Sequence, residues 1–220
     1  MARRGIEQPT HTRSPTERQH FDGAMYSLDI AAEALLAATV SVPWERPVHA
    51  ARLAFLRRVA HPGEVSVHVA CGTDRLGFID VAFGLTTILT DIDATTLDIL
   101  AQQFADLQRR LGPLAGSFQV QQLAVEALTG DAGFPAASVH HLTLQNLFNA
   151  HLHPAGAYPR IIDTLLRVIA HGGSYFITES EAAVLTTRAR LQQVQLSQIT
   201  QIQGYYDEQV LMFQVHKPQR

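Results

Sequence analysis

The chain has 220 residues, of which 46% are hydrophobic and 17% charged, and this fits one α/β domain with a full core and a modest extension. Its formal net charge of -3 and pI near 6.4 lack the basic excess of a nucleic-acid-binding protein, so no nucleic-acid partner is expected. The single cysteine, Cys71, excludes a disulfide framework and a cysteine-based zinc cluster, and no apolar run is long enough to span a bilayer. Because the N-terminus also lacks the apolar segment of a secretory signal, we expect a cytoplasmic protein with no membrane partner.

The first part of the chain is predicted to be a tail followed by a helical cap. Residues 1–20 combine Pro, Thr and Arg with almost no apolar side chains, which indicates a mobile tail. Residues 21–62 form the predicted N-terminal cap. In it, apolar residues recur with helical spacing from Ala24 to Val40, and prolines then enforce a break before a second helix from about Val48 to Ala60.

The rest of the chain is organised around a strand, turn, helix, strand and acid unit. Alternating β-formers begin at Val65, the small residues 70–73 interrupt them, a short helix follows, and a second strand runs from Thr86 to Thr90. Small residues let a ligand approach the backbone, and a helix that follows them presents free N–H groups to it. Asp91, at the end of the second strand, stands where this kind of unit holds a ribose by its hydroxyls. The alternative is a helix-capping or loop aspartate.

Strands and helices alternate through residues 63–220, the predicted main domain. This alternation predicts a parallel sheet with right-handed crossovers and ligand sites beyond the carboxyl ends of the strands. Three further helices are expected: Ala94 to about Leu111, capped by Asp93, then Tyr158 to Ala170, and about Glu181 to Gln192. Three further strands are expected at Phe118 to Gln122, Val139 to Leu144 and Ser174 to Thr178. Two closing strands, at about Val194 to Gln203 and Gln209 to Lys217, are expected to be joined by a hairpin at Gly204 to Asp207.

Three stretches resemble the class I S-adenosylmethionine-dependent methyltransferases: His68 to Asp74, Asp91 to Asp93, and the Gly-Gly turn in His171 to Ile177. In that family the first strand and turn read approximately LDVGCGTG, and a KPGGxLxI turn precedes the fifth strand. The resemblance implies a Rossmann-like three-layer α/β/α sandwich, with a mostly parallel seven-stranded sheet, an antiparallel last strand and additional N-terminal helices. It implies S-adenosylmethionine as cofactor and S-adenosylhomocysteine as product, with these cofactor-binding residues: His68, Ala70, Cys71, Gly72, Asp74, Asp91, Ile92, Leu123, Ala124 and Gln145.

The sequence departs from the family pattern at three of these positions. His68 replaces the usual acid, Asp74 the usual third glycine, and Leu123 an acid that often contacts adenine. Asp74 is expected either to attract the ammonium group of the cofactor or to cap a helix beginning at Arg75. In either role its charge disfavours a pyrophosphate at this turn, and Phe78 stands where a phosphate-binding P-loop requires lysine.

The resemblance also suggests residues for catalysis and for the substrate pocket. In this fold the segment after the fourth strand faces the transferred methyl group, and methyl transfer needs alignment of the reactants more than a strong base. Asn146 and His151 are therefore the catalytic candidates. The family's N-terminal helices help to shape the substrate pocket, so Tyr26, Trp44 and Arg52 are candidates to line it, with ordinary packing as the alternative.

The leading hypothesis is an S-adenosylmethionine-dependent methyltransferase that acts on a small molecule. The alternative, motivated by His68, Asp74 and Leu123, is a catalytically degenerate methyltransferase-like protein with a binding or regulatory role. A third possibility is other chemistry on a related nucleoside cofactor. No metal is expected, because the histidine-rich segment lacks a fitting carboxylate or cysteine pattern. The sequence makes no prediction of the oligomeric state.

Overall fold

The structure is a computed structural model that describes residues 30–40, 45–131, 133–145, 147, 155–178, 201–206 and 210–216. The predicted tail, the predicted helix at Glu181 to Gln192 and the start of the first predicted helix lie outside these residues. Within them, no helix has both the length and the apolar character needed to cross a membrane.

The described strands form one sheet in the order β3-β2-β1-β4-β5-β7-β6. Neighbours from β3 to β5 pair in parallel, whereas β7 pairs antiparallel with both β5 and β6. The predicted α/β fold with a parallel sheet and flanking helices is therefore confirmed. The strands are β1 (Val65–Val69), β2 (Thr86–Asp91), β3 (Ser117–Gln122), β4 (Val139–Gln145), β5 (Ile169–Thr178), β6 (Gln201–Tyr206) and β7 (Val210–His216).

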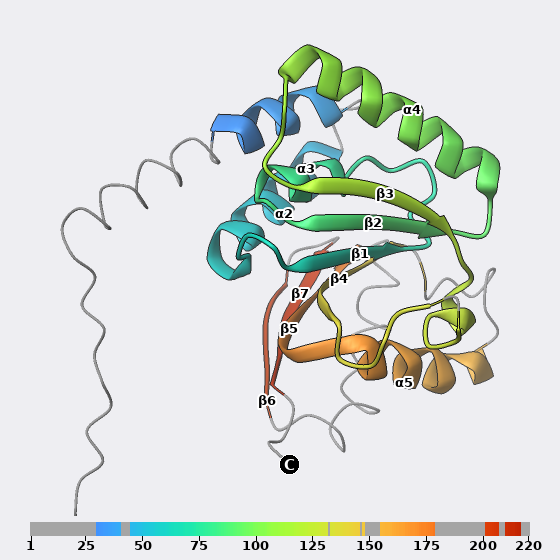
Figure 1. Cartoon of the computed structure of the whole chain (residues 1–220). Helices are drawn as coiled ribbons and strands as arrows, with labels where there is room; N and C mark the ends of the chain where they lie inside the picture. The colour runs from blue at the N-terminus through green and yellow to red at the C-terminus, as the bar shows by residue number, and fades with distance from the viewer. Residues whose placement is uncertain are drawn as a thin grey trace, which may run out of the picture.

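Helices cover both faces of this sheet (Figure 1). One face carries the helical residues 30–39 together with α2 (Glu45–Val59), α3 (Phe78–Ala82) and α4 (Ala94–Leu111). The other carries α5 (Tyr158–Val168) and the short 3-10 turn η1 (Val125–Ala127). A second 3-10 turn, η2 (Ala155–Ala157), leads directly into α5. The result is a three-layer arrangement with an apolar core on each side of the sheet.

Helix α4 begins and ends where the sequence predicts. The side chain of Asp93 accepts a hydrogen bond from Thr95 N (2.9 Å), which satisfies one of the free N–H groups at the helix start. Gly112 follows the last turn with a φ of +84°, a left-handed conformation that glycine adopts without strain. Between these ends the predicted inward-facing residues are all buried, namely Leu97, Leu100, Phe104 and Leu107.

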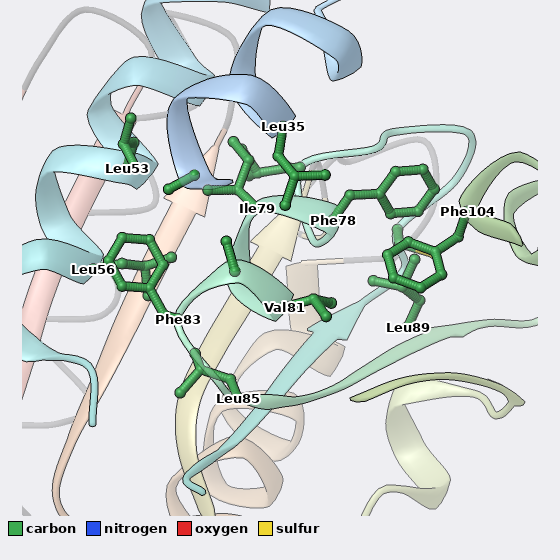
Figure 2. Close-up of a cluster of buried hydrophobic side chains, with 14 of the residues drawn as sticks. Leu35, Leu53, Leu56, Phe78, Ile79, Val81, Phe83, Leu85, Leu89 and Phe104 are labelled. Carbon is green, nitrogen blue, oxygen red and sulfur yellow. The ribbon is translucent and has the colours of Figure 1, made fainter. Parts of the chain in front are cut away.

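The core on the α4 side joins the N-terminal helices to the sheet. Figure 2 shows Leu35 of the first described helix, Leu53 and Leu56 of α2, and Ile79 of α3 gathered in one cluster of buried side chains. The same core extends to the far end of the layer, where the aromatic ring of Phe104 on α4 packs against Phe78 and Phe118. The N-terminal helices are thus packed into the main core, and residues on α2 are held at fixed positions relative to β1.

Two turns lie elsewhere than the sequence suggested. Helix α5 ends at Val168, and Ile169 already pairs with Val139, so the predicted Gly-Gly turn is a bulge inside β5. Gly172 has a φ of +76° in this bulge, and a Cβ on Gly173 would lie 2.9 Å from the carbonyl oxygen of His140, so both positions favour glycine.

The predicted hairpin at Gly204 to Asp207 is also displaced. Gly204 pairs with Phe213 and Tyr206 with Leu211, so residues 204–206 belong to β6. The connection to β7 therefore falls at residues 207–209, which lie outside the described residues. Tyrosines with strong β propensity extend the strand through positions that the glycine had marked as a turn.

Candidate functional site

The strand order reverses between β1 and β4, because β2 and β3 continue the sheet on one side of β1 while β4 and β5 continue it on the other. In open parallel sheets, ligands bind beyond the carboxyl ends of the strands at such a point. The turn at residues 70–74 follows β1, Asp91 ends β2, Leu123 and Ala124 follow β3, and Gln145 ends β4. The structure thus brings these predicted cofactor-binding positions to one edge of the sheet, whereas His68 lies within β1.

The turn after β1 is tight and leaves space beside its backbone. Ala70 and Gly72 both have left-handed backbones, with φ of +52° and +53°. The turn is fastened by hydrogen bonds from Cys71 N to Thr90 O (3.1 Å) and from Asp74 N to Cys71 O (3.1 Å). Among the described residues, no heavy atom lies within 4 Å of the position that a Cβ on Gly72 would take. The backbone at Gly72 is therefore open to close approach by a ligand.

Asp91 connects this turn to the end of β2. Its Oδ2 accepts a hydrogen bond from Gly72 N (2.9 Å), and its Oδ1 accepts one from Asp93 N (3.0 Å). The residue is half-buried, and each carboxylate oxygen keeps a second lone pair. The carboxylate is thus fixed in place by backbone donors and can accept further hydrogen bonds from ligand hydroxyls.

Apolar residues flank Asp91 in two different ways. Ile92 has an exposed fraction of 70%, and its carbonyl oxygen accepts a hydrogen bond from the Gln122 side chain (2.9 Å). Leu123 donates its N–H to Asp91 O (2.9 Å), but its side chain is buried in the core on the α5 side. Ala124 is half-buried where η1 begins. Ile92 therefore offers an exposed apolar surface, whereas Leu123 positions Asp91 through its backbone.

Cys71 is not a nucleophile at neutral pH. Its side chain is buried, and burial together with the nearby charge of Asp91 raises the pKa of the thiol to about 12. The thiol thus stays protonated and uncharged within the turn.

A buried polar network lies beneath the turn and includes two predicted site residues, His68 and Arg52. The Arg52 guanidinium donates to both carboxylate oxygens of Asp80 on α3, with Nε 3.0 Å from Oδ1. His68 Nε2 lies 2.9 Å from Asp80 Oδ2, and the Ser66 hydroxyl donates to the same oxygen. All four side chains are fully buried.

This network changes the interpretation of both residues. Burial by itself raises the pKa of Asp80, but the charges of Arg52 and His68 outweigh it and hold that pKa well below its ordinary value. The carboxylate is therefore ionised and neutralises Arg52. Arg52 was expected at the wall of a substrate pocket and His68 at the cofactor. The structure places both side chains in the interior, because a buried carboxylate on α3 draws them there.

Asp74 does not cap a helix. Helix α3 begins at Phe78 with Gly77 as its N-cap, so no helix begins at Arg75. Instead, Asp74 Oδ1 accepts a hydrogen bond from Leu76 N (2.7 Å) and lies 3.3 Å from Nε2 of His49 on α2. Its side chain is 32% exposed. The predicted capping role at Arg75 is thus replaced by a local bond that fixes the chain leading into α3.

Several predicted residues lie outside the described part of the chain: Tyr26, Trp44, Asn146 and His151. Their roles stay predictions. Gln145 is placed by its backbone, which pairs with Thr178 in β5. Within the described ranges, no group of three or more His, Cys, Asp or Glu side chains is arranged to hold a metal ion.

The sequence interpretation missed the polar partners Ser66, Asp80, His49 and Thr39. One signal was present, because Asp80 is the acid within the apolar run Phe78 to Phe83, and such a residue is usually buried with a partner. That partner is Arg52, which lies 28 positions earlier in the chain. The pairing follows only from the packing of α2 on α3.

No protein-family model matches the sequence, and no curated protein matches it. Solved structures do match. The N-methyltransferase NodS from Bradyrhizobium japonicum, in complex with S-adenosylhomocysteine, aligns with a TM-score of 0.60 at 11% identity over 88% of this chain and 100% of that chain. A SAM-dependent methyltransferase from Methanosarcina mazei aligns with a TM-score of 0.57 at 12% identity, over 74% of this chain and 98% of that chain. An rRNA methylase from Streptococcus thermophilus aligns with a TM-score of 0.54 at 17% identity, over 79% of this chain and 98% of that chain.

These similarities show which fold the chain has. It is the Rossmann-like fold of the class I S-adenosylmethionine-dependent methyltransferases, and the resemblance inferred from the sequence is confirmed at this level. The matched structures include an N-methyltransferase and an rRNA methylase, so the shared fold serves different substrates.

Proposed function

We propose that the protein binds S-adenosylmethionine at the carboxyl edge of β1 and β2 and transfers its methyl group to a small molecule. The observation that carries this proposal is the 2.9 Å hydrogen bond from Gly72 N to Asp91 Oδ2. It joins the open turn after β1 to the acid at the end of β2, at the point where the strand order reverses. A nucleoside placed along this edge meets a fixed carboxylate and an unobstructed backbone.

The residues at this edge fit the parts of the cofactor. Asp91 has free lone pairs for the ribose hydroxyls, and Ile92, with an exposed fraction of 70%, offers apolar surface to the adenine ring. Gly72 allows the chain carrying the sulfonium to pass close to the backbone. Asp74 supplies a carboxylate for the ammonium group of the amino-acid part.

When bound, the cofactor supplies an electrophilic methyl group, so the protein has to orient the acceptor and exclude water. Gln145 ends β4 at this edge. We assign the alignment of the acceptor to Asn146 and His151, and the shape of the pocket to Tyr26 and Trp44. The composition supports a small acceptor. With 17 Lys and Arg against 20 Asp and Glu, the chain lacks the basic excess that binding to a polyanionic RNA requires.

A second candidate is a binding protein that has lost catalysis. It is favoured by one observation, namely that His68, at the position of the family's usual acid, is sequestered against Asp80 and fully buried. In this case the nucleoside would still bind through Asp91, but no acceptor would be methylated.

Calorimetric titration with S-adenosylhomocysteine, followed by a methyl-transfer assay on a panel of small amine, hydroxyl and thiol acceptors, separates the candidates. We expect binding by the wild type and a loss of about ten- to a hundredfold in Asp91→Ala, because a charged acceptor for the ribose hydroxyls is removed. Asp98→Ala, which removes an exposed acid of α4, is the matched control and should bind normally. Binding without turnover favours the second candidate, and no binding by the wild type rejects both.

A further inference from the structure

A buried histidine on α2 faces the cofactor turn. His49 is 1% exposed, and its Nε2 lies 3.3 Å from Asp74 Oδ1. Its Nδ1 lies 3.2 Å from the hydroxyl of Thr39, which is also 1% exposed and belongs to the helical residues 30–39. These contacts connect both N-terminal helices to the turn after β1.

The surrounding groups define which atom of His49 carries hydrogen. The Thr39 hydroxyl has two acceptors within reach, His49 Nδ1 at 3.2 Å and Leu36 O at 3.4 Å. Among the described residues, His49 Nε2 has no hydrogen-bond partner, and the carboxylate of Asp74 is the charged group that faces it. The two groups form no hydrogen bond, but a nitrogen lone pair 3.3 Å from a carboxylate oxygen would be repelled by it whereas an N–H would be attracted. Nε2 therefore carries the hydrogen and Nδ1 accepts from Thr39.

This arrangement restrains Asp74 at one of its two carboxylate oxygens. Oδ1 accepts from Leu76 N (2.7 Å) and is flanked by His49 Nε2. Among the described residues, Oδ2 makes no hydrogen bond, and the side chain is 32% exposed. A carboxylate that is already oriented loses little conformational freedom when it binds a cation. A buried Nε2–H also loses its charged neighbour if Asp74 rotates away, so His49 opposes that rotation.

We propose that His49 is a positioning residue that holds Asp74 toward the ammonium group of S-adenosylmethionine. The N-terminal helices thereby contribute to cofactor affinity through the chain Thr39, His49 and Asp74. This inference rests on the proposed function. It assigns to His49 an effect on one part of the cofactor, the amino-acid moiety, and none on the nucleoside.

The test compares two ligands that differ in this moiety. S-adenosylhomocysteine carries the ammonium group, whereas 5′-methylthioadenosine has the same nucleoside without the amino-acid part. For His49→Leu we expect affinity for S-adenosylhomocysteine to fall about five- to tenfold and affinity for methylthioadenosine to stay unchanged, because one oriented charged contact is lost. His49→Gln, which keeps an N–H donor, should restore affinity to within about twofold of the wild type.

A double-mutant cycle and a folding control complete the design. Asp74→Asn should lower the affinity for S-adenosylhomocysteine and leave that for methylthioadenosine unchanged. Adding His49→Leu to Asp74→Asn should lower the affinity no further, because His49 acts through Asp74. Asp91→Ala should weaken both ligands, since both contain the ribose. Should His49→Leu fail to fold by circular dichroism, His49→Asn, a polar but shorter side chain, replaces it.

Each outcome decides between the two proposals. Equal losses for both ligands would assign His49 a merely structural role, and an unchanged affinity for S-adenosylhomocysteine would remove it from the site. Either result overturns this inference while the wild type still binds the nucleoside. Failure of the wild type to bind either ligand would overturn the proposed function itself.

Discussion

Two residues of the turn after β1 adopt the same left-handed backbone, although only one of them is glycine. Ala70 has a φ of +52° and Gly72 a φ of +53°. For an L-residue this conformation costs roughly 1 to 2 kcal/mol relative to the right-handed region, and glycine avoids that cost. Ala70 thus stores backbone strain in the turn after β1.

We expect opposite effects from exchanging these two residues. Ala70→Gly removes strain but loosens the unfolded chain, with a net gain of about 0.5 to 1 kcal/mol in the free energy of unfolding. Gly72→Ala should lose a similar amount, because its Cβ enters open space and adds only backbone strain. Urea denaturation monitored by circular dichroism measures both changes. Changes of the same sign in the free energy of unfolding of the two variants would contradict the left-handed geometry of both residues.

Gly72→Ala should also weaken binding of S-adenosylhomocysteine, because the added methyl group occupies the space in which we place the ligand. Ala70→Gly serves as the matched control and should bind at least as well as the wild type. A Gly72→Ala variant with unchanged affinity would place the ligand elsewhere on this edge.

At the scale of elements, α2 and α3 are joined by a buried ion pair between Arg52 and Asp80. Both side chains are fully buried, and His68 and Ser66 on β1 add hydrogen bonds to the same carboxylate. Within the described residues, Arg52 Nη1 has no hydrogen-bond partner, but the guanidinium also lies 5.1 Å from the centre of the Phe176 ring on β5. The pair thus fixes α2 and α3 on the sheet beneath the turn that follows β1.

Removing one member of this pair should be costly. We expect Asp80→Ala to lower the free energy of unfolding by about 3 to 5 kcal/mol, because the Arg52 charge stays buried without its partner. The double variant Arg52→Met with Asp80→Leu should recover most of that loss, since apolar side chains of similar volume replace both charges. Denaturant unfolding of both variants provides the measurement. A double variant that is less stable than Asp80→Ala would show that the charges themselves are needed.

At the scale of the whole molecule, carboxylates whose pKa is lowered by folding contribute to the response of stability to acid. Burial tends to raise the pKa of Asp80 and of Glu64, but the basic neighbours Arg52 and His68 for Asp80, and a hydrogen bond from His141 for Glu64, outweigh it. Both pKa values are therefore lowered from their ordinary values of 3.8 and 4.5. A lowered pKa in the folded state stabilises the fold above the ordinary pKa, and this contribution is lost as the pH falls toward the lowered value.

We therefore expect the free energy of unfolding to decrease as the pH falls below about 4.5. The difference between the wild type and Asp80→Asn should be largest near neutral pH and should shrink in acid, because protonation of Asp80 has the same effect as the amide. Urea unfolding across a pH series measures this difference, with Asp98→Asn on the surface of α4 as the control. A difference that stays constant down to about pH 2 would contradict the ionised pair.

Local chemistry was enough to predict much of the fold from the sequence. The alternating apolar pattern of β1, the capping side chain of Asp93 and the glycine after Leu111 act within a few residues of the elements they define. The edge of the sheet that carries the candidate site could also be predicted, because strands joined by helices run parallel and bring their carboxyl ends together. The sequence therefore predicts Asp91 and Gly72 at one edge of the sheet, and a hydrogen bond joins them there.

The tertiary structure alone decided where polar side chains point. His68 and Arg52 have residue types that suit a ligand site, but Asp80 draws both into the interior across 12 and 28 positions of sequence. His49 likewise meets Asp74 only because α2 packs over the turn after β1. A strand pattern defines which face a side chain occupies, whereas the partner it finds there comes from another element. The alternation of strands and helices, and with it a parallel sheet, could thus be predicted from local periodicity, whereas the polar network required the packing of helices on the sheet.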